Sequence, residues 1–342
     1  MENKMLKKIV NENNSVNFGS YSEQLELNFQ DYQLPNFFNK LKSKKKTIKQ
    51  LKKFSFLAIS SDKYLIGIAL VKTHLAGNIF VYAYEKDKGM IFEDSFNVFG
   101  KNALTYSGDN FNCEIKYQRK NKQVHTTKKQ NGEITLNFNF ENKLICNAVA
   151  IIPKDYQRLI VANPADFSYW TFTEKMQAIP LQSIQVKLDN QIIIDEASNS
   201  MMASDWSAGF FHPETNWLWA ACGGKIGNDK IGFNFAIFNN DALYPEKCVW
   251  INNKKYVFDR ILFDVNYLNP QSQPIHIYDN DKTVDLYFTI DAVEPQVKNY
   301  FNAIKMNFKQ YVGFFNGTIK VDGKTYKLNN LIGLFEVHKS VW

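Results

Sequence analysis

One short segment of the chain, from Asp205 to Gly224, gathers residues whose types could do chemistry. It places the carboxyl group of Asp205 close in sequence to three of the six tryptophans, Trp206, Trp217 and Trp219. A carboxyl group that is buried among aromatic rings has a raised pKa and can hold a proton at neutral pH. Protonation of an alkene leaves a carbocation, which indole faces stabilise. Asp205 is therefore a candidate general acid, although it could instead cap a turn by accepting a backbone amide hydrogen bond.

Two of these tryptophans share one face of a predicted strand. Trp217 and Trp219 flank Leu218, and alternate residues of a strand point to the same side. The two rings either line a cavity or fill a core, and the small residues after Trp219 would leave room for a ligand. Together with Trp206 and Trp250, they form our set of candidate ligand-binding tryptophans.

A histidine, His212, lies in a predicted loop between Asp205 and the tryptophan strand. It is either a second acid–base group or an ordinary loop residue. The five histidines are not spaced as metal ligands, and the four cysteines contain no CxxC pair. We therefore expect no metal and no other cofactor.

Arg260 is a further candidate catalytic residue, because this chain uses lysine for almost all of its positive charge. An arginine in such a background could clamp a carboxylate, with Asp259, Glu246 or Glu336 as its partner, or could form a structural ion pair between strands. Asn234 interrupts an apolar strand and needs a hydrogen-bond partner if it is buried. Asn234 and Glu246 are candidate ligand-binding residues.

The composition favours a folded protein with a small-molecule site over a nucleic-acid-binding protein. The 342 residues suffice for two domains, and the 28 phenylalanines and 17 tyrosines suit strands and aromatic cavities. The net charge of +7 comes from lysine, whereas nucleic-acid binding relies on arginine. The basic run Lys40–Lys53 is either a solvated segment or a weak contact for an acidic or membrane surface.

The sequence shows no targeting or membrane signal. The N-terminal residues lack the apolar core of a signal peptide, and no apolar run approaches the length of about 20 residues that a membrane helix needs. Without a secretory context, we expect the four cysteines to be reduced thiols in a cytoplasmic protein. The sequence makes no prediction of the oligomeric state.

The pattern of apolar residues predicts an all-β fold. A helix is expected within Leu34–Lys53, and from Phe54 onward apolar residues alternate with polar ones in short segments that Gly, Asn and Asp residues separate. No alternation of strands and helices occurs, and no glycine-rich phosphate loop follows a strand. We predict antiparallel β-barrels preceded by a short helix.

An internal similarity places two domains along the chain. Ser183–Trp206 and Gly317–Trp342 each contain an alternating strand, a turn of Asp-Asn or Asp-Gly, a second strand, and an acidic residue, Asp205 or Glu336. Asp-Gly between alternating strands is a strong hairpin signal. Such a match could also arise by chance between two hairpins. We predict a first barrel over residues 1–200 and a second over residues 201–342, with Glu336 as a contact that closes the second barrel.

Several segments resemble a known family. The chain is similar to a family catalogued only as a domain of unknown function, and the similarity rests on the segments DWSAG, NWLWAACGG, KIGFNF, FDR and the terminal GLFEVHKSVW. That family is placed near the carotenoid 1,2-hydratase-like proteins of the calycin superfamily. The resemblance implies two tandem lipocalin-like β-barrels. In the hydratase-like relatives an Asp at the position of Asp205 is a proposed proton donor, but they tend to have Asp-His-x-Trp where this chain has Asp-Trp-Ser.

These observations leave three classes of function open. The first is the binding of a hydrophobic or amphipathic small molecule in an aromatic cavity at or near the domain interface. The second is a cofactor-independent hydratase, isomerase or cyclase that acts on a lipid- or polyene-like substrate with Asp205 as the acid. The third is a structural or protein-interaction module, for which we expect barrels that are filled by side chains.

Overall fold

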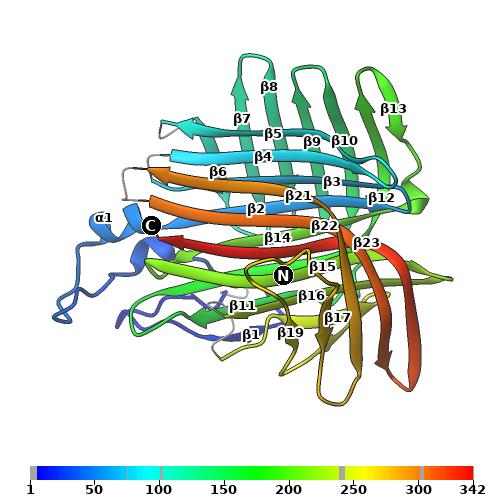
Figure 1. Ribbon diagram of the computed structural model, residues 1–342. Helices are drawn as coiled ribbons and strands as arrows, with labels where there is room; N and C mark the ends of the chain where they lie inside the picture. Colours follow the sequence, from blue (N-terminus) through cyan, green and yellow to red (C-terminus); the bar gives the residue numbers. More distant parts are fainter. Residues whose placement is uncertain (1–5, 75, 101–102, 239–242, 301–303, 342) are drawn as a thin grey trace.

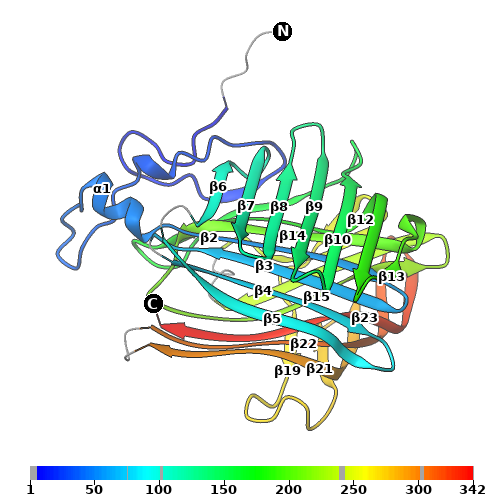
Figure 2. The same ribbon diagram turned by 90° about the horizontal axis from the view of Figure 1, so that it is seen from above.

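The computed structural model describes residues 6–74, 76–100, 103–238, 243–300 and 304–341, which form an all-β structure with one short helix (Figure 1). Two antiparallel sheets account for this part of the chain, and each sheet curves into a partly closed barrel (Figure 2). The predicted all-β fold class is therefore confirmed. Short polar turns connect most neighbouring strands, in keeping with the clusters of Asn, Asp, Gly and Lys in the sequence.

The first sheet contains fourteen of the described strands. Its main path runs in the order β5-β4-β3-β2-β14-β12-β10-β9-β8-β7-β6, with β1, β11 and β13 attached at its side. The bounds are β1 Gly19–Tyr21, β2 Lys52–Ser61, β3 Tyr64–Lys72, β4 Ala76–Glu85, β5 Gly89–Phe99, β6 Leu104–Gly108, β7 Cys113–Arg119, β8 Lys122–Lys128, β9 Glu133–Phe140, β10 Leu144–Ile151, β11 Leu159–Pro164, β12 Trp170–Leu188, β13 Gln191–Ile194 and β14 Ser200–Phe210.

The second sheet contains nine of the described strands, in the order β18-β17-β16-β15-β23-β22-β21-β20-β19. The bounds are β15 Glu214–Ile226, β16 Asp229–Phe238, β17 Lys247–Ile251, β18 Lys254–Val257, β19 Leu262–Asp264, β20 Ile275–Tyr278, β21 Val284–Tyr300, β22 Ile304–Val321 and β23 Lys324–Val341.

The longest strands bend where the pairing register shifts. β12 has such a shift between Met176 and Ile179, and β22 has one between Phe315 and Gly317. A β-bulge adds a residue to one strand, and it bends and twists that strand locally. Figure 1 shows the consequence, because β22 and β23 run beside the strands of the first sheet and then turn away from them. The same strands therefore contribute residues both to the contact between the two sheets and to the second barrel.

Among the described residues, three of the four buried apolar clusters form layers that follow from the alternation of side chains along these strands. Residues such as Leu57 and Ile59 point into a core inside the first sheet, and Phe233 and Phe315 belong to a core inside the second. The opposite faces of the same strands meet in a third layer between the two sheets. That layer contains Phe56, Ala58, Leu65, Ala69, Phe80, Tyr82 and Tyr84 from the first sheet and Trp219, Ala221, Ala236, Phe308, Val312, Ile332 and Leu334 from the second.

The two predicted hairpin turns are present. Asp189 and Asn190 connect β12 to β13, Asp322 and Gly323 connect β22 to β23, and all four residues have positive φ angles, as a type I′ turn requires. The first copy of the internal similarity then breaks at a 3-10 turn, Ala197–Asn199, whereas the second continues as one strand. The division into two domains stays a prediction. In the structure β14 belongs to the first sheet, so the change from one sheet to the other falls between residues 210 and 214.

The predicted N-terminal helix is present but short. It comprises α1, Lys44–Thr47, extended by a 3-10 turn, Ile48–Gln50, whereas we had expected a helix within Leu34–Lys53. Pro35 disfavours helical backbone at the residue before it, and the run from residue 40 to 46 offers no apolar stripe to bury. Phe37 and Phe38, which lie within the predicted range, are 92% and 76% exposed.

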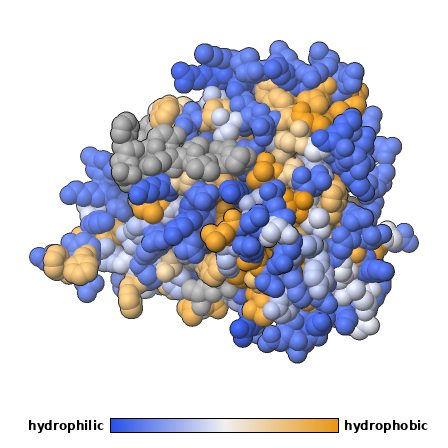
Figure 3. All heavy atoms as spheres, viewed as in Figure 1, coloured by the Kyte–Doolittle hydropathy of each residue, from blue (hydrophilic) through white to orange (hydrophobic). Residues whose placement is uncertain are grey.

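The visible surface is mostly hydrophilic, with apolar residues in patches between polar ones (Figure 3). All four cysteines are free thiols and are buried. None of the helices in the described ranges has the length and apolar character needed to cross a bilayer.

Candidate functional site

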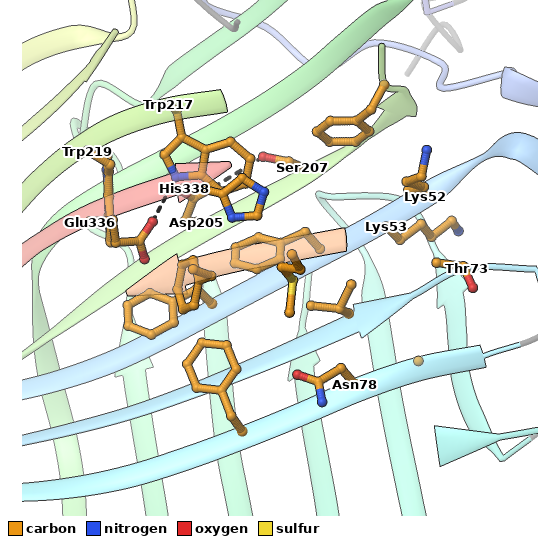
Figure 4. A pocket seen from close by; sticks show the side chains of 18 of the residues that line it. Lys52, Lys53, Thr73, Asn78, Asp205, Ser207, Trp217, Trp219, Glu336 and His338 are labelled. Atoms are coloured by element: carbon orange, nitrogen blue, oxygen red, sulfur yellow. Dashed lines mark hydrogen bonds between the residues drawn. The ribbon is translucent and has the colours of Figure 1, made fainter. Parts of the chain in front are cut away.

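A cavity of about 420 Å³ lies between the two sheets, in the third apolar layer (Figure 4). Its walls come from both halves of the chain. The first sheet contributes Phe56 and Phe80, and the second contributes Trp217, Trp219 and Phe308. The position at the interface agrees with the place where we expected a cavity, although it lies outside the core of either barrel.

The strand periodicity explains why these rings face the cavity. Trp217 and Trp219 point to the side of β15 that faces the first sheet, whereas Leu218 between them is buried in the core of the second sheet. On β2, Phe56 points into the cavity and Leu57 into the core of the first sheet. The Phe56 and Trp219 rings meet edge to face, with centroids 5.8 Å apart. Large side chains from both sheets therefore surround the space without filling it.

Asp205 lies on the cavity wall and is held in a buried ion pair. Its Oδ2 lies 3.0 Å from Nζ of Lys175, its cross-strand neighbour on β12, and its Oδ1 accepts a hydrogen bond from Ser207 at 3.3 Å. Lys175 Nζ also lies 3.2 Å from a carboxylate oxygen of Glu246, and all three charged side chains are buried. Burial alone would lower the pKa of Lys175, but the two carboxylates outweigh it and the pKa of Lys175 is raised.

A second carboxyl group on the same wall, that of Glu336, has a different environment. Glu336 Oε2 accepts a hydrogen bond from Nε1 of Trp217 at 2.9 Å, and its Oε1 accepts one from the amide of Gln310 on the neighbouring strand. Within the described part of the chain Glu336 makes no ion pair. Burial raises the pKa of Glu336 to about 7, with the negative charge of Asp205 as an additional cause.

His338 forms a flat, neutral part of the wall. Its ring stacks on Trp217 with centroids 3.6 Å apart and planes 6° apart, and its Nε2 lies 2.9 Å from the Ser340 hydroxyl. Burial lowers the pKa of His338 to about 3, so the imidazole is uncharged at neutral pH. Trp217 is thereby fixed on one side by His338 and at its nitrogen by Glu336.

Two lysines line the end of the cavity that lies farthest from Glu336 in Figure 4. Burial lowers the pKa of Lys52 to about 8, and its Nζ lies 6.0 Å from the centroid of the Phe211 ring. Burial also lowers the pKa of Lys53. The sequence suggested the run Lys40–Lys53 as a surface contact, but its last two residues are half-buried and reach the cavity.

Asn234 and Glu246 support the wall from behind. Asn234 is fully buried; its Oδ1 accepts a hydrogen bond from Nε1 of Trp219 at 2.6 Å, and its Nδ2 donates to the backbone oxygen of Glu246 at 2.7 Å. The Glu246 side chain pairs with Lys175. Both residues orient groups that face the cavity, and neither lines it.

The other candidate tryptophans point away from the cavity. Trp206 follows Asp205 on β14, so it faces the opposite side of the sheet and packs on Phe172. Trp250 packs with the core of the first sheet, where its Nε1 donates a hydrogen bond to the backbone oxygen of Gln157 at 2.6 Å. The structure thus brings together Asp205, Trp217 and Trp219 but not these two rings.

His212 and Arg260 also lie outside the cavity. The Nδ1 atom of His212 contacts the backbone of Glu214, and its Nε2 lies 3.6 Å from the Asp166 carboxylate in a partly exposed loop. Arg260 is exposed. We therefore leave both residues out of the site proposed below.

Three important cavity residues, Lys175, Glu336 and His338, were not among the predicted site residues. Lys175 does not belong to any sequence motif, and only its pairing with Asp205 across β12 and β14 shows that it is part of the site. Glu336 could have been predicted as a site residue, because the internal similarity matched it with Asp205. Both carboxyl groups lie on the wall of one cavity. Among the described residues, no group of three or more His, Cys, Asp or Glu side chains is arranged to hold a metal ion.

The raised pKa of Glu336 predicts a pH-dependent stability. Because the folded state binds this proton more tightly than the unfolded state does, the stabilisation is complete below about pH 4.5 and is lost as the pH rises through about 7. Glutamine does not titrate. Between about pH 4.5 and about pH 8, we expect the free energy of unfolding of the wild type to fall by about 3 kcal/mol relative to that of Glu336→Gln. Urea unfolding measures the free energy of unfolding of both proteins as a function of pH. Parallel pH profiles would contradict the raised pKa of Glu336.

Comparison with protein families identifies the group to which the chain belongs. A family model described as "Domain of unknown function (DUF2804)" matches residues 30–342. The chain is a member of this family. The match confirms the part of the sequence resemblance that pointed to a domain of unknown function. No match was found among curated proteins.

Solved structures share the fold of this DUF2804 protein at very low sequence identity. One is the crystal structure of CghA with Sch210972, with 8% identity, a TM-score of 0.53, and coverage of 85% of this chain and 88% of that one. Another is kievitone hydratase from Nectria haematococca, with 10% identity, a TM-score of 0.51 and the same coverage. At this identity the similarity establishes the fold alone.

Proposed function

We propose that this DUF2804 protein binds a hydrophobic or amphipathic small molecule in the cavity between its two sheets. The observation that carries the proposal is the aromatic-walled space of about 420 Å³, which lies within the range of small-molecule sites. A purely structural module would have no need of this space or of the charged groups beside it. The structural neighbours support the proposal, since one was crystallised with a compound and another is named a hydratase.

The lining suggests how such a molecule would be oriented. Its apolar body would lie between the Phe56 and Phe80 rings of one sheet and the Trp217 and Trp219 rings of the other. A polar group could reach Lys52 at one end, whereas the other end presents buried carboxyl groups that disfavour an anion. The proposed ligand is therefore neutral at its inner end.

A neutral, environment-sensitive dye such as Nile red tests the proposal. We expect Trp217→Ala to raise the Kd of the dye about tenfold, because it removes one ring from the wall. Trp206→Ala is the matched control. Trp206 belongs to the same strand as Asp205, but its ring lies on the face of the sheet away from the cavity and is buried in another apolar cluster. The control should lower stability while leaving the affinity of the folded protein unchanged. Equal affinities of the wild type, Trp217→Ala and Trp206→Ala for the dye would contradict a binding site in the cavity.

A second function, acid–base catalysis, is favoured by one specific observation. The two carboxyl groups on the cavity wall have different partners, because Asp205 pairs with a lysine and Glu336 accepts hydrogen bonds only from neutral donors in the described part of the chain. Two carboxyl groups in contrasting environments are a recurring basis for acid–base chemistry. The same cavity would then hold a substrate rather than a stored ligand.

A further inference from the structure

We propose that Glu336, and not Asp205, donates a proton to the molecule bound in the cavity, and that this molecule offers it an electron-rich carbon such as that of an alkene. The inference rests on the proposed binding function and names the reacting group of that same site. It replaces the candidate acid that the sequence suggested with one that the geometry favours.

The contacts of Asp205 make it a poor proton donor. Its carboxylate lies 3.0 Å from the Lys175 ammonium and also accepts a hydrogen bond from Ser207. Protonation of Asp205 would break a buried ion pair, which is costly because the remaining charge has little access to water. Asp205 is better suited to remain a fixed negative charge beside the cavity.

Glu336 can exist in both protonation states without leaving its position. As a carboxylate it accepts hydrogen bonds from Trp217 and from the Gln310 amide nitrogen. Gln310 is fully buried, and within the described residues its own Oε1 has no hydrogen-bond partner. A flip of the Gln310 amide would turn this oxygen toward Glu336, where it could accept the proton of the acid form. The arrangement therefore suits a carboxyl group that gains and loses a proton.

Burial favours the acid form of Glu336, and the negative charge of Asp205 adds to this effect. Asp205 on β14 adds negative charge, and Lys175 on β12 opposes it. His338 on the same strand is neutral, and the buried hydroxyl of Tyr82 on β4 has a pKa raised by burial and by the charge of Glu336. Consistent with this, the pKa of Glu336 is raised to about 7, mainly by burial. At neutral pH a substantial fraction of Glu336 then carries a proton.

The chemical step needs no other reagent. The O–H bond of Glu336 breaks, its proton forms a C–H bond with the π electrons of the bound alkene, and Glu336 becomes a carboxylate. The resulting carbocation forms in a cavity that is lined by the Asp205 carboxylate and by the indole rings of Trp217 and Trp219, and these groups stabilise positive charge. Loss of a proton from the adjacent carbon to Glu336 restores the acid and leaves the double bond shifted. No atom or electron is gained or lost overall.

Esterification by an apolar diazo compound tests this step directly. Diphenyldiazomethane reacts only with a protonated carboxyl group, whose proton moves to the diazo carbon before N₂ leaves and the carboxylate bonds to that carbon. At about pH 6 we expect an ester on Glu336, located by peptide mass spectrometry, at a rate at least tenfold above that at Asp205. The rate should fall about tenfold for each pH unit above about 7. Glu336→Gln should show no ester at this position.

Two results would overturn the proposal, and a Nile red measurement on the same sample tells them apart. If the dye binds but the ester forms on Asp205, or on neither residue, Glu336 is not the proton donor although the cavity binds apolar molecules. If neither the ester nor dye binding is observed, the proposed binding function fails together with this inference.

Discussion

Replacement of Lys175 by methionine is expected to destabilise the folded protein by about 3–5 kcal/mol at neutral pH. The Lys175 ammonium is the counter-charge of two buried carboxylates, those of Asp205 and Glu246, at 3.0 and 3.2 Å. Methionine retains the length of the apolar part of the side chain but leaves both carboxylates without this partner. The free energy of unfolding from urea titration measures the effect.

An exposed ion pair provides the matched control for this prediction. Lys44 lies 3.1 Å from Asp31, but the two side chains are 57% and 40% exposed. The same change, Lys44→Met, should cost less than about 1 kcal/mol. Equal losses for the two variants would show that the buried cluster does not stabilise the fold.

Ala236→Phe is expected to abolish the binding of Nile red, with a Kd raised at least a hundredfold. Ala236 lines the cavity and is the cross-strand neighbour of Trp219. A phenylalanine ring at this position would project into the space that the ligand needs, whereas every hydrogen-bonding group of the site would remain. Overpacking should cost about 1–3 kcal/mol of stability, so the variant should stay folded.

The control for this variant adds the same ring elsewhere. Ala197 lies in the 3-10 turn before β14, is half-buried, and does not line the cavity. Ala197→Phe should leave dye affinity within about twofold of the wild type. Unchanged affinity in Ala236→Phe would place the dye outside this cavity and would count against the proposed function.

Local sequence patterns predicted much of the fold. The alternation around Leu218 correctly placed Trp217 and Trp219 on one face, and the Asp-Asn and Asp-Gly pairs marked two real turns. The helix predicted within Leu34–Lys53 is longer than the helix that the structure contains, Lys44–Thr47 with the 3-10 turn Ile48–Gln50. Helix length depends on what the apolar face can pack against, and Phe37 and Phe38 have little to cover them.

The candidate site was harder to predict because strand register assembles it. Lys175 meets Asp205 across a pair of strands, and a shift in pairing just beyond Met176 helps to set that register. A shift of one residue would turn every side chain to the other face, so the sequence alone could not show which of the neighbours Asp205 and Trp206 faces the cavity. His212 is close to Asp205 in sequence, yet the loop that contains it lies outside the cavity. Proximity along the chain was thus a poor guide to proximity in space.

The most direct test of the central claim is a crystal structure of the wild-type protein grown with Nile red. Our account predicts dye density between the two sheets, in contact with the Trp217 and Trp219 rings and with Phe56 opposite them. Dye bound only at the outer surface, or a space between the sheets that is closed by side chains, would contradict the claim that this cavity is a binding site.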